Sequence, residues 1–316
     1  MVTEVTKKLL GVPDSFVDDI GGVTLSSFWP VLQVAFDDIP GDIVEIGADR
    51  GFVTERLGAI CSTVDRAFYS IDPSPASHVG EIGGVHHMRM TSKEFFKNNP
   101  VAGGIWIVDG DHNYETVMME LNNISSLCKG RDTVVFLHDL GWPWGRRDLW
   151  YNPAERGSGS ILVDGKRSIS LDHPKTVSYG LGIELGAVSA VAEVEGGPKN
   201  GVLTALEDFL KSPEGDGWQF TWTPIFYGVG MLTYREERSQ RFARLDQYFD
   251  AFNQVAPILS SLELNRLRLL QTLHNKWSDN HQKDEEIARL YPLATRAIPF
   301  IRSFVSRAFR KILGGK

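Results

Sequence analysis

Apolar and polar positions alternate in blocks along residues 41–234. Short runs rich in β-branched residues are almost wholly apolar, which is typical of strands that helices cover on both faces, and the segments between them are long enough to form crossover helices. This pattern predicts an α/β fold with a doubly wound, mainly parallel sheet, of the Rossmann-like kind. The predicted strands are 43–46, 67–71, 84–88, 105–108 and 133–137, and the helices between them are 52–61, 92–98 and 114–127.

The block pattern lapses after Asp139 and returns near residue 201. The intervening segment of about sixty residues is longer than an ordinary loop and therefore usually functional, so we expect residues 140–200 to form an insert that acts as a lid. A helix over 201–210 and two runs at 218–223 and 225–234 follow, and the runs predict an antiparallel hairpin that closes the sheet. We therefore expect a main domain over 41–235, preceded by a helical segment over 1–40.

The sequence from Glu236 onward favours long helices. The segments 239–255 and 258–280 predict a helical or coiled-coil extension, and the leucines of the second segment suit a packing face or a homo-oligomer contact. Residues 292–316 contain six basic and no acidic residues among apolar positions at helical spacing. This pattern predicts a basic amphipathic helix that docks on a partner or makes peripheral contact with anionic lipid.

Composition narrows the function classes. The net charge of −7 argues against a nucleic-acid partner, because phosphate binding needs a concentrated basic face. The two cysteines, Cys61 and Cys128, have no metal-ligand spacing and are expected to be inert core thiols. The sequence has no signal peptide and no apolar run long enough to span a membrane, so we expect a cytoplasmic protein, with any membrane contact at the inner face through the terminal helix.

A short loop after the first strand suits a nucleotide-like cofactor. The strand ends at Glu45, and the small residues that follow it allow the backbone to approach a ligand at the carboxyl edge of the sheet. The next strand ends at Asp72, whose carboxylate is placed to accept hydrogen bonds from ribose hydroxyls. The sequence lacks both GxGxxG and the P-loop motif, which favours a cofactor without phosphate. A strand-turn-helix unit with only a structural role is the alternative. The candidate cofactor-binding residues of this loop are Glu45, Gly47, Ala48, Asp49, Arg50 and Gly51.

The loop and Asp72 together resemble the class I S-adenosylmethionine-dependent methyltransferases. The resemblance implies that Gly47 and its neighbours line the methionine moiety and that Asp72 holds the ribose. It also implies that Thr91 and Ser92, which follow the third strand, flank the adenine. The implied cofactor is S-adenosylmethionine, and Asp109, at the end of the fourth strand, is counted among the cofactor-binding residues.

Acids and imidazoles follow two neighbouring strands, where ligands of an open α/β sheet bind. Asp109, His138 and Asp139 form a candidate divalent-metal site for Mg²⁺ or Mn²⁺. This pattern narrows the resemblance to metal-dependent O-methyltransferases of antibiotic and polysaccharide sugars and to cephalosporin-hydroxylase-like proteins. Asp111 or His112 is the candidate catalytic base. The structural alternatives are a helix cap for the first pair and an ordinary strand end for the second.

The insert begins with residues that suit a polyhydroxylated ligand, because aromatic faces and guanidinium donors both contact sugars. These candidate substrate-binding residues are Trp142, Trp144, Arg146, Arg147 and Tyr151. The leading hypothesis is therefore metal-assisted O-methylation of a sugar hydroxyl. Methylation of a non-sugar hydroxyl or carboxylate, a non-catalytic assembly role and an oxidative role stay open as alternatives.

Overall fold

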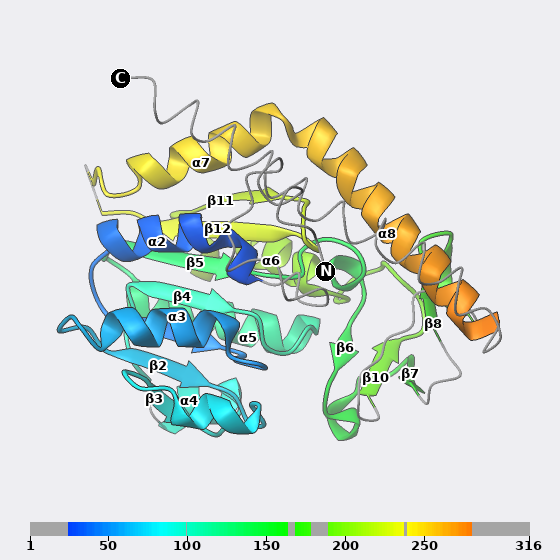
Figure 1. Ribbon diagram of the computed structural model, residues 1–316, viewed down its shortest axis with the longest axis horizontal. Helices are drawn as coiled ribbons and strands as arrows, with labels where there is room; N and C mark the ends of the chain where they lie inside the picture. The colour runs from blue at the N-terminus through cyan, green and yellow to red at the C-terminus, as the bar shows by residue number, and fades with distance from the viewer. Residues whose placement is uncertain (1–24, 99, 164–167, 178–188, 237–238, 280–316) are drawn as a thin grey trace, which may run out of the picture.

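The computed structural model describes residues 25–98, 100–163, 168–177, 189–236 and 239–279. Its centre is a seven-stranded sheet in the order β11-β12-β5-β4-β1-β2-β3 (Figure 1). The first five strands along the chain pair in parallel, and β12 is antiparallel to both β5 and β11. These strands are β1 (Ile43–Ile46), β2 (Phe68–Ile71), β3 (His86–Met88), β4 (Ile105–Val108), β5 (Thr133–Leu137), β11 (Trp218–Thr223) and β12 (Val229–Tyr234).

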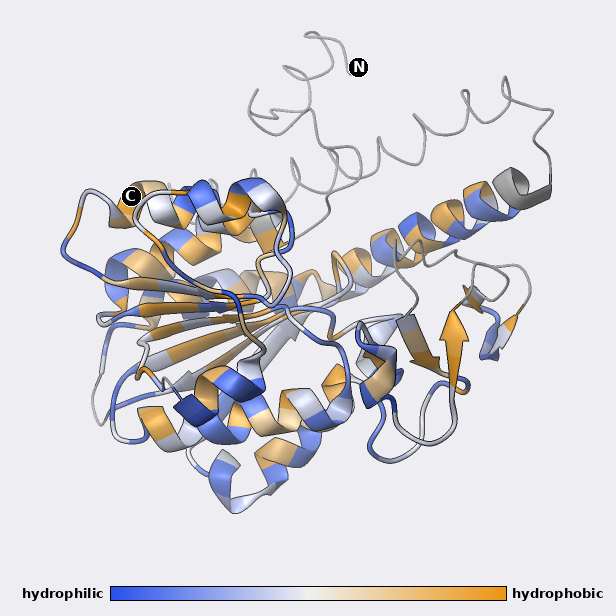
Figure 2. Ribbon diagram, turned by 90° about the horizontal axis from the view of Figure 1, so that it is seen from below, coloured by the Kyte–Doolittle hydropathy of each residue, from blue (hydrophilic) through white to orange (hydrophobic). Residues whose placement is uncertain are grey.

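Helices cover both faces of the sheet because the buried strands β1, β4 and β5 present apolar side chains to both sides. One core cluster packs α2, α3 and α7 against one face, and a second packs α4, α5 and α6 against the other. Figure 2 shows the apolar strands enclosed between amphipathic helices. The helices are α2 (Trp29–Asp38), α3 (Phe52–Cys61), α4 (Ser92–Asn98), α5 (Tyr114–Cys128), α6 (Val202–Lys211), α7 (Ala243–Gln254) and α8 (Ala256–Asp279).

The doubly wound sheet and its closing hairpin are confirmed, with element bounds close to those predicted. The largest difference lies in the second hairpin strand, which begins at Val229 rather than at residue 225. Phe226 and Tyr227 have φ values of 55° and 65°, so the chain turns there and cannot continue an extended strand. Both expected core thiols are buried and free.

The insert has more secondary structure than a loop. Its described residues contain a small sheet of β6 (Leu149–Trp150), β10 (Ser189–Ala192) and β7 (Ser160–Val163), and a pair formed by β8 (Ser168–Ser170) and β9 (His173–Val177). Asp148 fixes the insert to the main domain, because its Oδ1 accepts hydrogen bonds from the backbone N–H groups of Tyr114 and Gly201, at the starts of α5 and α6. Because the insert contains these strands, the expectation of a long loop was wrong in its local structure.

Short 3₁₀ helices occur at Leu25–Phe28, Ser77–Glu81, Trp144–Arg146, Pro153–Glu155 and Pro213–Gly215.

Helix α8 runs across the molecule from α7 to the insert (Figure 1). Near its middle, Glu263 and Arg266 form a buried two-contact ion pair, with Arg266 Nε and one terminal nitrogen 2.8 and 2.6 Å from the carboxylate oxygens. Glu263 also accepts a hydrogen bond from the backbone N–H of Tyr227, and the Arg266 guanidinium lies over the Tyr227 ring. Farther along, Gln271 accepts a hydrogen bond from the backbone of Leu171 in the insert.

The predicted basic helix over 292–316 lies outside the described residues. Among the helices that the structure describes, none is both long and apolar enough to cross a membrane.

We expect Glu263→Ala to lower the free energy of unfolding by about 3–5 kcal/mol, because it leaves the buried Arg266 without its ion-pair partner. The Tyr227 N–H loses its acceptor in the same change. Urea unfolding followed by circular dichroism measures the difference. Asn265→Ala, on the exposed side of the same helix, is the control and should change stability little. Equal stability of the two variants would contradict a structural role for the pair.

Candidate functional site

The loop between β1 and α3 comes unusually close to the end of β4. Gly47 has φ of +89°, and a Cβ atom there would lie 2.1 Å from the carbonyl oxygen of Asp109. Only glycine fits such an approach. Gly51, also with positive φ, precedes α3, while Ala48 is buried and Arg50 is exposed. The backbone of this loop is therefore held at the carboxyl edge of the sheet, where a cofactor would bind.

Glu45 lies beneath this loop rather than on its surface. Its side chain is 2% exposed, and one carboxylate oxygen accepts hydrogen bonds from the hydroxyls of Thr54 and Ser70 at 2.7 and 2.8 Å. Burial raises the pKa of Glu45 to about 7. The carboxyl group therefore joins β1 to α3 and β2, so any effect on a cofactor acts through the shape of the loop.

Asp72 is connected to the same loop. One carboxylate oxygen accepts hydrogen bonds from the backbone N–H groups of Ala48 and Asp49 at 2.9 and 3.0 Å, and the other accepts one from Ser74. A carboxylate has about four acceptor sites, so these three bonds leave room on the second oxygen for about one ribose hydroxyl. The structure therefore brings Asp72 and the glycine loop together, as the sequence suggested.

The turn after β3 is a helix cap. The Thr91 hydroxyl accepts a hydrogen bond from the Glu94 backbone, and the Glu94 carboxylate accepts one from the Thr91 backbone, which is the reciprocal arrangement of a capping box. Next to it, Ser92 is buried and contacts Glu120 of α5, whose pKa burial raises to about 8. Sequence reasoning missed Glu120, because a glutamate within a predicted helix gives no sign that it faces the core.

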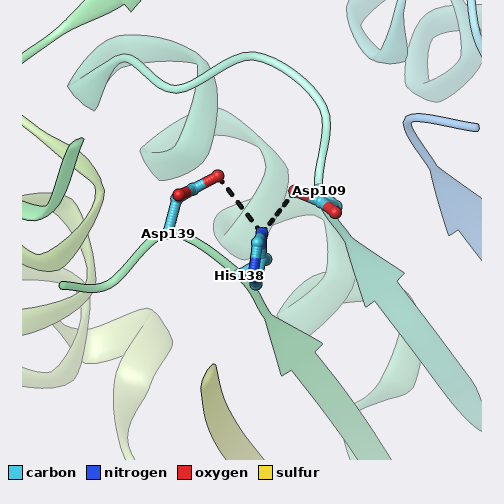
Figure 3. Close-up of side chains that lie close together, drawn as sticks. All are labelled: Asp109, His138 and Asp139. Carbon is cyan, nitrogen blue, oxygen red and sulfur yellow. Dashed lines mark hydrogen bonds and ion pairs between the residues drawn. The ribbon is translucent and has the colours of Figure 1, made fainter. Parts of the chain in front are cut away.

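Asp109, His138 and Asp139 meet at the ends of β4 and β5 (Figure 3). His138 Nδ1 lies 3.0 Å from Asp109 Oδ1 and 3.2 Å from Asp139 Oδ2. Successive side chains of a strand point to opposite faces, so two consecutive residues can converge only where the strand ends in a turn. Asp139 provides that turn with φ of 59°. The two imidazoles of the site, His138 and His112, lower the pKa of Asp139 despite its burial.

The turn between β11 and β12 holds the His138 ring. Nε2 of His138 lies 2.9 Å from the carbonyl oxygen of Phe226, a group that can only accept a hydrogen bond, so Nε2 carries the proton. Nδ1 of His138 then faces two carboxylate oxygens. All three atoms carry lone pairs, so they can lie this close only if a second proton on Nδ1 or a bound cation lies between them. Ligand histidines typically donate their other N–H to a carbonyl in this way. The donor set thus fits a divalent ion.

The candidate bases lie on the loop between β4 and α5. Asp111 accepts hydrogen bonds from the Asn113 and Thr116 side chains, so it borders the start of α5, and burial raises its pKa. His112 faces the metal cluster instead. Its Nε2 lies 3.0 Å from Asp139 Oδ2, and although burial opposes the charge, Asp139 and Asp109 raise the pKa of His112 to about 10.

Of the candidate substrate residues, two lie beside the metal cluster, and the others pack against or bind other parts of the protein. Trp144 and Tyr151 flank the His112 ring, with centroid distances of 6.3 and 5.6 Å, and Tyr151 is also exposed. Trp142 packs at the edge of the second core cluster. In contrast, Arg146 forms a two-contact ion pair with Glu207.

Arg147 is fully buried, and its two terminal nitrogens donate hydrogen bonds to the carbonyls of Ala192 and Pro174. Its Nε is buried without a hydrogen-bond partner. With no exposed surface, the guanidinium is not available to a substrate at the surface of the site. Sequence reasoning placed it there because guanidinium chemistry does not reveal burial.

Comparisons with known proteins bear on the segment that carries this site. Residues 44–140 match a family model described as a methyltransferase domain. Similar solved structures include an SAH-bound methyltransferase from Podospora anserina, with 14% identity, 75% coverage of this chain, 97% coverage of that chain and a TM-score of 0.42. A putative caffeoyl-CoA O-methyltransferase from Staphylococcus aureus has 13% identity, 72% and 88% coverage and a TM-score of 0.39. At these scores the likeness decides nothing about substrate or mechanism. No curated protein sequence matches this chain significantly.

The raised pKa of Glu45 predicts a pH-dependent stability. The folded protein holds this proton up to about pH 7, whereas the unfolded chain releases it near the ordinary value of 4.5. Stability contributed by the neutral carboxyl therefore falls as the pH rises through this window, by about 3 kcal/mol in total. Relative to Glu45→Gln, the wild type should lose stability between these pH values and remain level above them.

Urea unfolding at several pH values measures the difference between the wild type and the variant. Glu55→Gln, at an exposed position on α3, is the matched control and should follow the wild type. A constant difference between wild type and Glu45→Gln at all pH values would contradict the assignment.

Proposed function

We propose that the protein, whose residues 44–140 match a family model described as a methyltransferase domain, is an S-adenosylmethionine-dependent O-methyltransferase, assisted by Mg²⁺ or Mn²⁺, that acts on a sugar hydroxyl. The observation that carries the proposal is that the glycine loop and the metal cluster are in contact at the carboxyl edge of the sheet. The glycine loop suited to the cofactor touches the backbone of Asp109, and Asp109 belongs to the cluster suited to the metal. Cofactor and acceptor would therefore lie side by side.

The proposed cofactor site consists of the loop from Gly47 to Gly51, Asp72 and the turn at Thr91 and Ser92. The backbone around Gly47 would contact the methionine moiety, and the carboxylate of Asp72 would accept a hydrogen bond from a ribose hydroxyl. The loop has no phosphate-binding motif, which fits a cofactor without phosphate.

In the proposed reaction the acceptor oxygen attacks the methyl carbon, the bond from that carbon to the sulfonium sulfur breaks, and the sulfur becomes a neutral thioether. The hydroxyl proton passes to a base, either Asp111 or His112. Most of the work of the protein is alignment, because an in-line displacement requires the oxygen, carbon and sulfur to be collinear. Asp109, His138 and Asp139 would hold a divalent ion, which supplies charge that acidifies and orients the acceptor hydroxyl.

A sugar acceptor is supported by the surface beside the cluster. Tyr151 is 47% exposed and lies against His112, so it presents an aromatic face next to the carboxylates. Although the side chain as a whole is half exposed, burial around its hydroxyl end and the carboxylates of Asp139 and Asp109 raise the pKa of the phenol, which therefore stays neutral and able to donate a hydrogen bond. Aromatic faces with nearby polar groups are typical of sugar sites.

Replacing Asp72 by alanine should weaken binding of S-adenosylmethionine by roughly tenfold to hundredfold, the cost of one or two hydrogen bonds to a charged group. Titration calorimetry of the full chain measures the affinity. Asp65→Ala, at an exposed position in the turn before β2, at the other end of that strand, should bind like the wild type. If wild-type protein binds no S-adenosylmethionine, the enzyme proposal fails.

Turnover tests the acceptor and the metal separately. The full chain is incubated with methyl-labelled S-adenosylmethionine, Mg²⁺ or Mn²⁺, and a panel of glycosides matched against phenols and carboxylic acids. We expect labelled glycosides only, with turnover reduced at least about hundredfold in Asp109→Ala and Asp139→Ala and by chelation. Label in phenols or acids alone would transfer the proposal to the non-sugar acceptors, and chelator-resistant turnover would remove the metal.

A further inference from the structure

His112 is held rigidly but lacks ordinary hydrogen-bond partners. Its side chain is 7% exposed, and neither ring nitrogen makes a hydrogen bond of acceptable geometry. The Trp144 ring lies nearly parallel to it and the Tyr151 ring meets it at 60°, so the plane of the imidazole is fixed. The backbone carbonyl of His112 also accepts a hydrogen bond from the N–H of Leu149. Burying an imidazole nitrogen without a hydrogen-bond partner costs folding free energy, unless a bound ion or ligand contacts that nitrogen.

The Nε2 atom of His112 points at the same two oxygens as His138. It lies 3.0 Å from Asp139 Oδ2 and 3.6 Å from Asp109 Oδ1. His138 Nδ1 lies 3.2 and 3.0 Å from these same atoms. Each of the two nitrogens thus lies within 3.6 Å of both oxygens, and the four atoms come from the ends of β4 and β5 and from the loop before α5.

These separations match the spacing of ligand atoms around one ion. A bond length of about 2.1 Å places neighbouring ligands about 3.0 Å apart in an octahedral site and about 3.4 Å apart in a tetrahedral one. The four nitrogen-to-oxygen distances run from 3.0 to 3.6 Å. The two nitrogen-to-oxygen distances of His112 therefore fall in the same range as those of His138, which belongs with Asp109 and Asp139 to the group whose ligand atoms all lie within 4.8 Å of one another.

We propose that His112 is the fourth ligand of this site, so that two imidazoles and two carboxylates bind a first-row transition ion such as Mn²⁺, Fe²⁺, Co²⁺ or Zn²⁺ in preference to Mg²⁺. Magnesium prefers sites made of oxygen, whereas imidazole nitrogen favours the transition ions. The inference rests on the metal site of the proposed function. It takes His112 out of the choice of base and leaves Asp111, its neighbour on the same loop.

Metal titration of the full chain tests the ligand set without any turnover. After chelation and removal of the chelator, Mn²⁺, Co²⁺ and Mg²⁺ are titrated separately by calorimetry. We expect the transition ions to bind at least about tenfold more tightly than Mg²⁺. His112→Ala should weaken their binding by at least about tenfold, since even losing an outer-sphere partner costs this much. His173→Ala, an exposed histidine of β9, is the matched control and should bind like the wild type.

The outcomes separate the inference from the function on which it rests. Equal affinity for Mg²⁺ and Mn²⁺, or His112→Ala with wild-type affinities, would overturn the fourth ligand while the three-residue site stands. Absence of binding by any of the ions would remove the metal site itself, in which case protons alone join the four groups, and binding of S-adenosylmethionine remains a separate measurement.

A second experiment needs no variant and so does not depend on how His112→Ala folds. Pulsed electron paramagnetic resonance of the Mn²⁺-loaded protein, labelled with ¹⁵N-histidine, counts the imidazole nitrogens bound to the ion. Two nitrogens are expected, and one would overturn the inference.

Discussion

The buried side chains of His112, His138 and Asp139 meet the partly buried carboxylate of Asp109 beside the ends of β4 and β5, and this constraint governs the structure around them. A charge removed from water costs several kcal/mol unless an opposite charge or a hydrogen bond compensates it, so each group needs a partner in a fixed place. Asp139 adopts a left-handed conformation to reach His138. His138 in turn needs an acceptor for its second nitrogen, and the carbonyl of Phe226 provides it.

That requirement extends to parts of the chain remote in sequence. Phe226 and Tyr227 both have positive φ, an uncommon conformation for large residues that persists only where neighbours hold it. Glu263 of α8 binds the Tyr227 N–H, and Arg266 covers the Tyr227 ring. Helix α8 therefore supports the site through the turn before β12. From the other side, the insert holds His112 through the backbone of Leu149.

The strands β1, β4 and β5 could be predicted to the residue because each is buried on both faces, which makes its sequence mostly apolar. The strands of the insert escaped prediction for the opposite reason. The sequence of β9 has exposed polar residues such as His173 and Lys175 and no clear apolar alternation. Its extended conformation depends on pairing with β8 and with residues 193–195. Likewise, the chemistry of Arg147 suggested a substrate contact, whereas its position in the insert buries it.

The sequence by itself determined the doubly wound fold, the glycine loop and the carboxyl edge at which Asp72, Asp109, His138 and Asp139 gather, because strand periodicity dictates where each strand ends. Only the tertiary structure decided which atoms meet there. The tautomer of His138 depends on a carbonyl eighty-eight residues away, and the direction of the His112 ring depends on aromatic neighbours from the insert. Long-range contacts of this kind leave no local periodicity in a sequence, so they emerge only when the chain is folded.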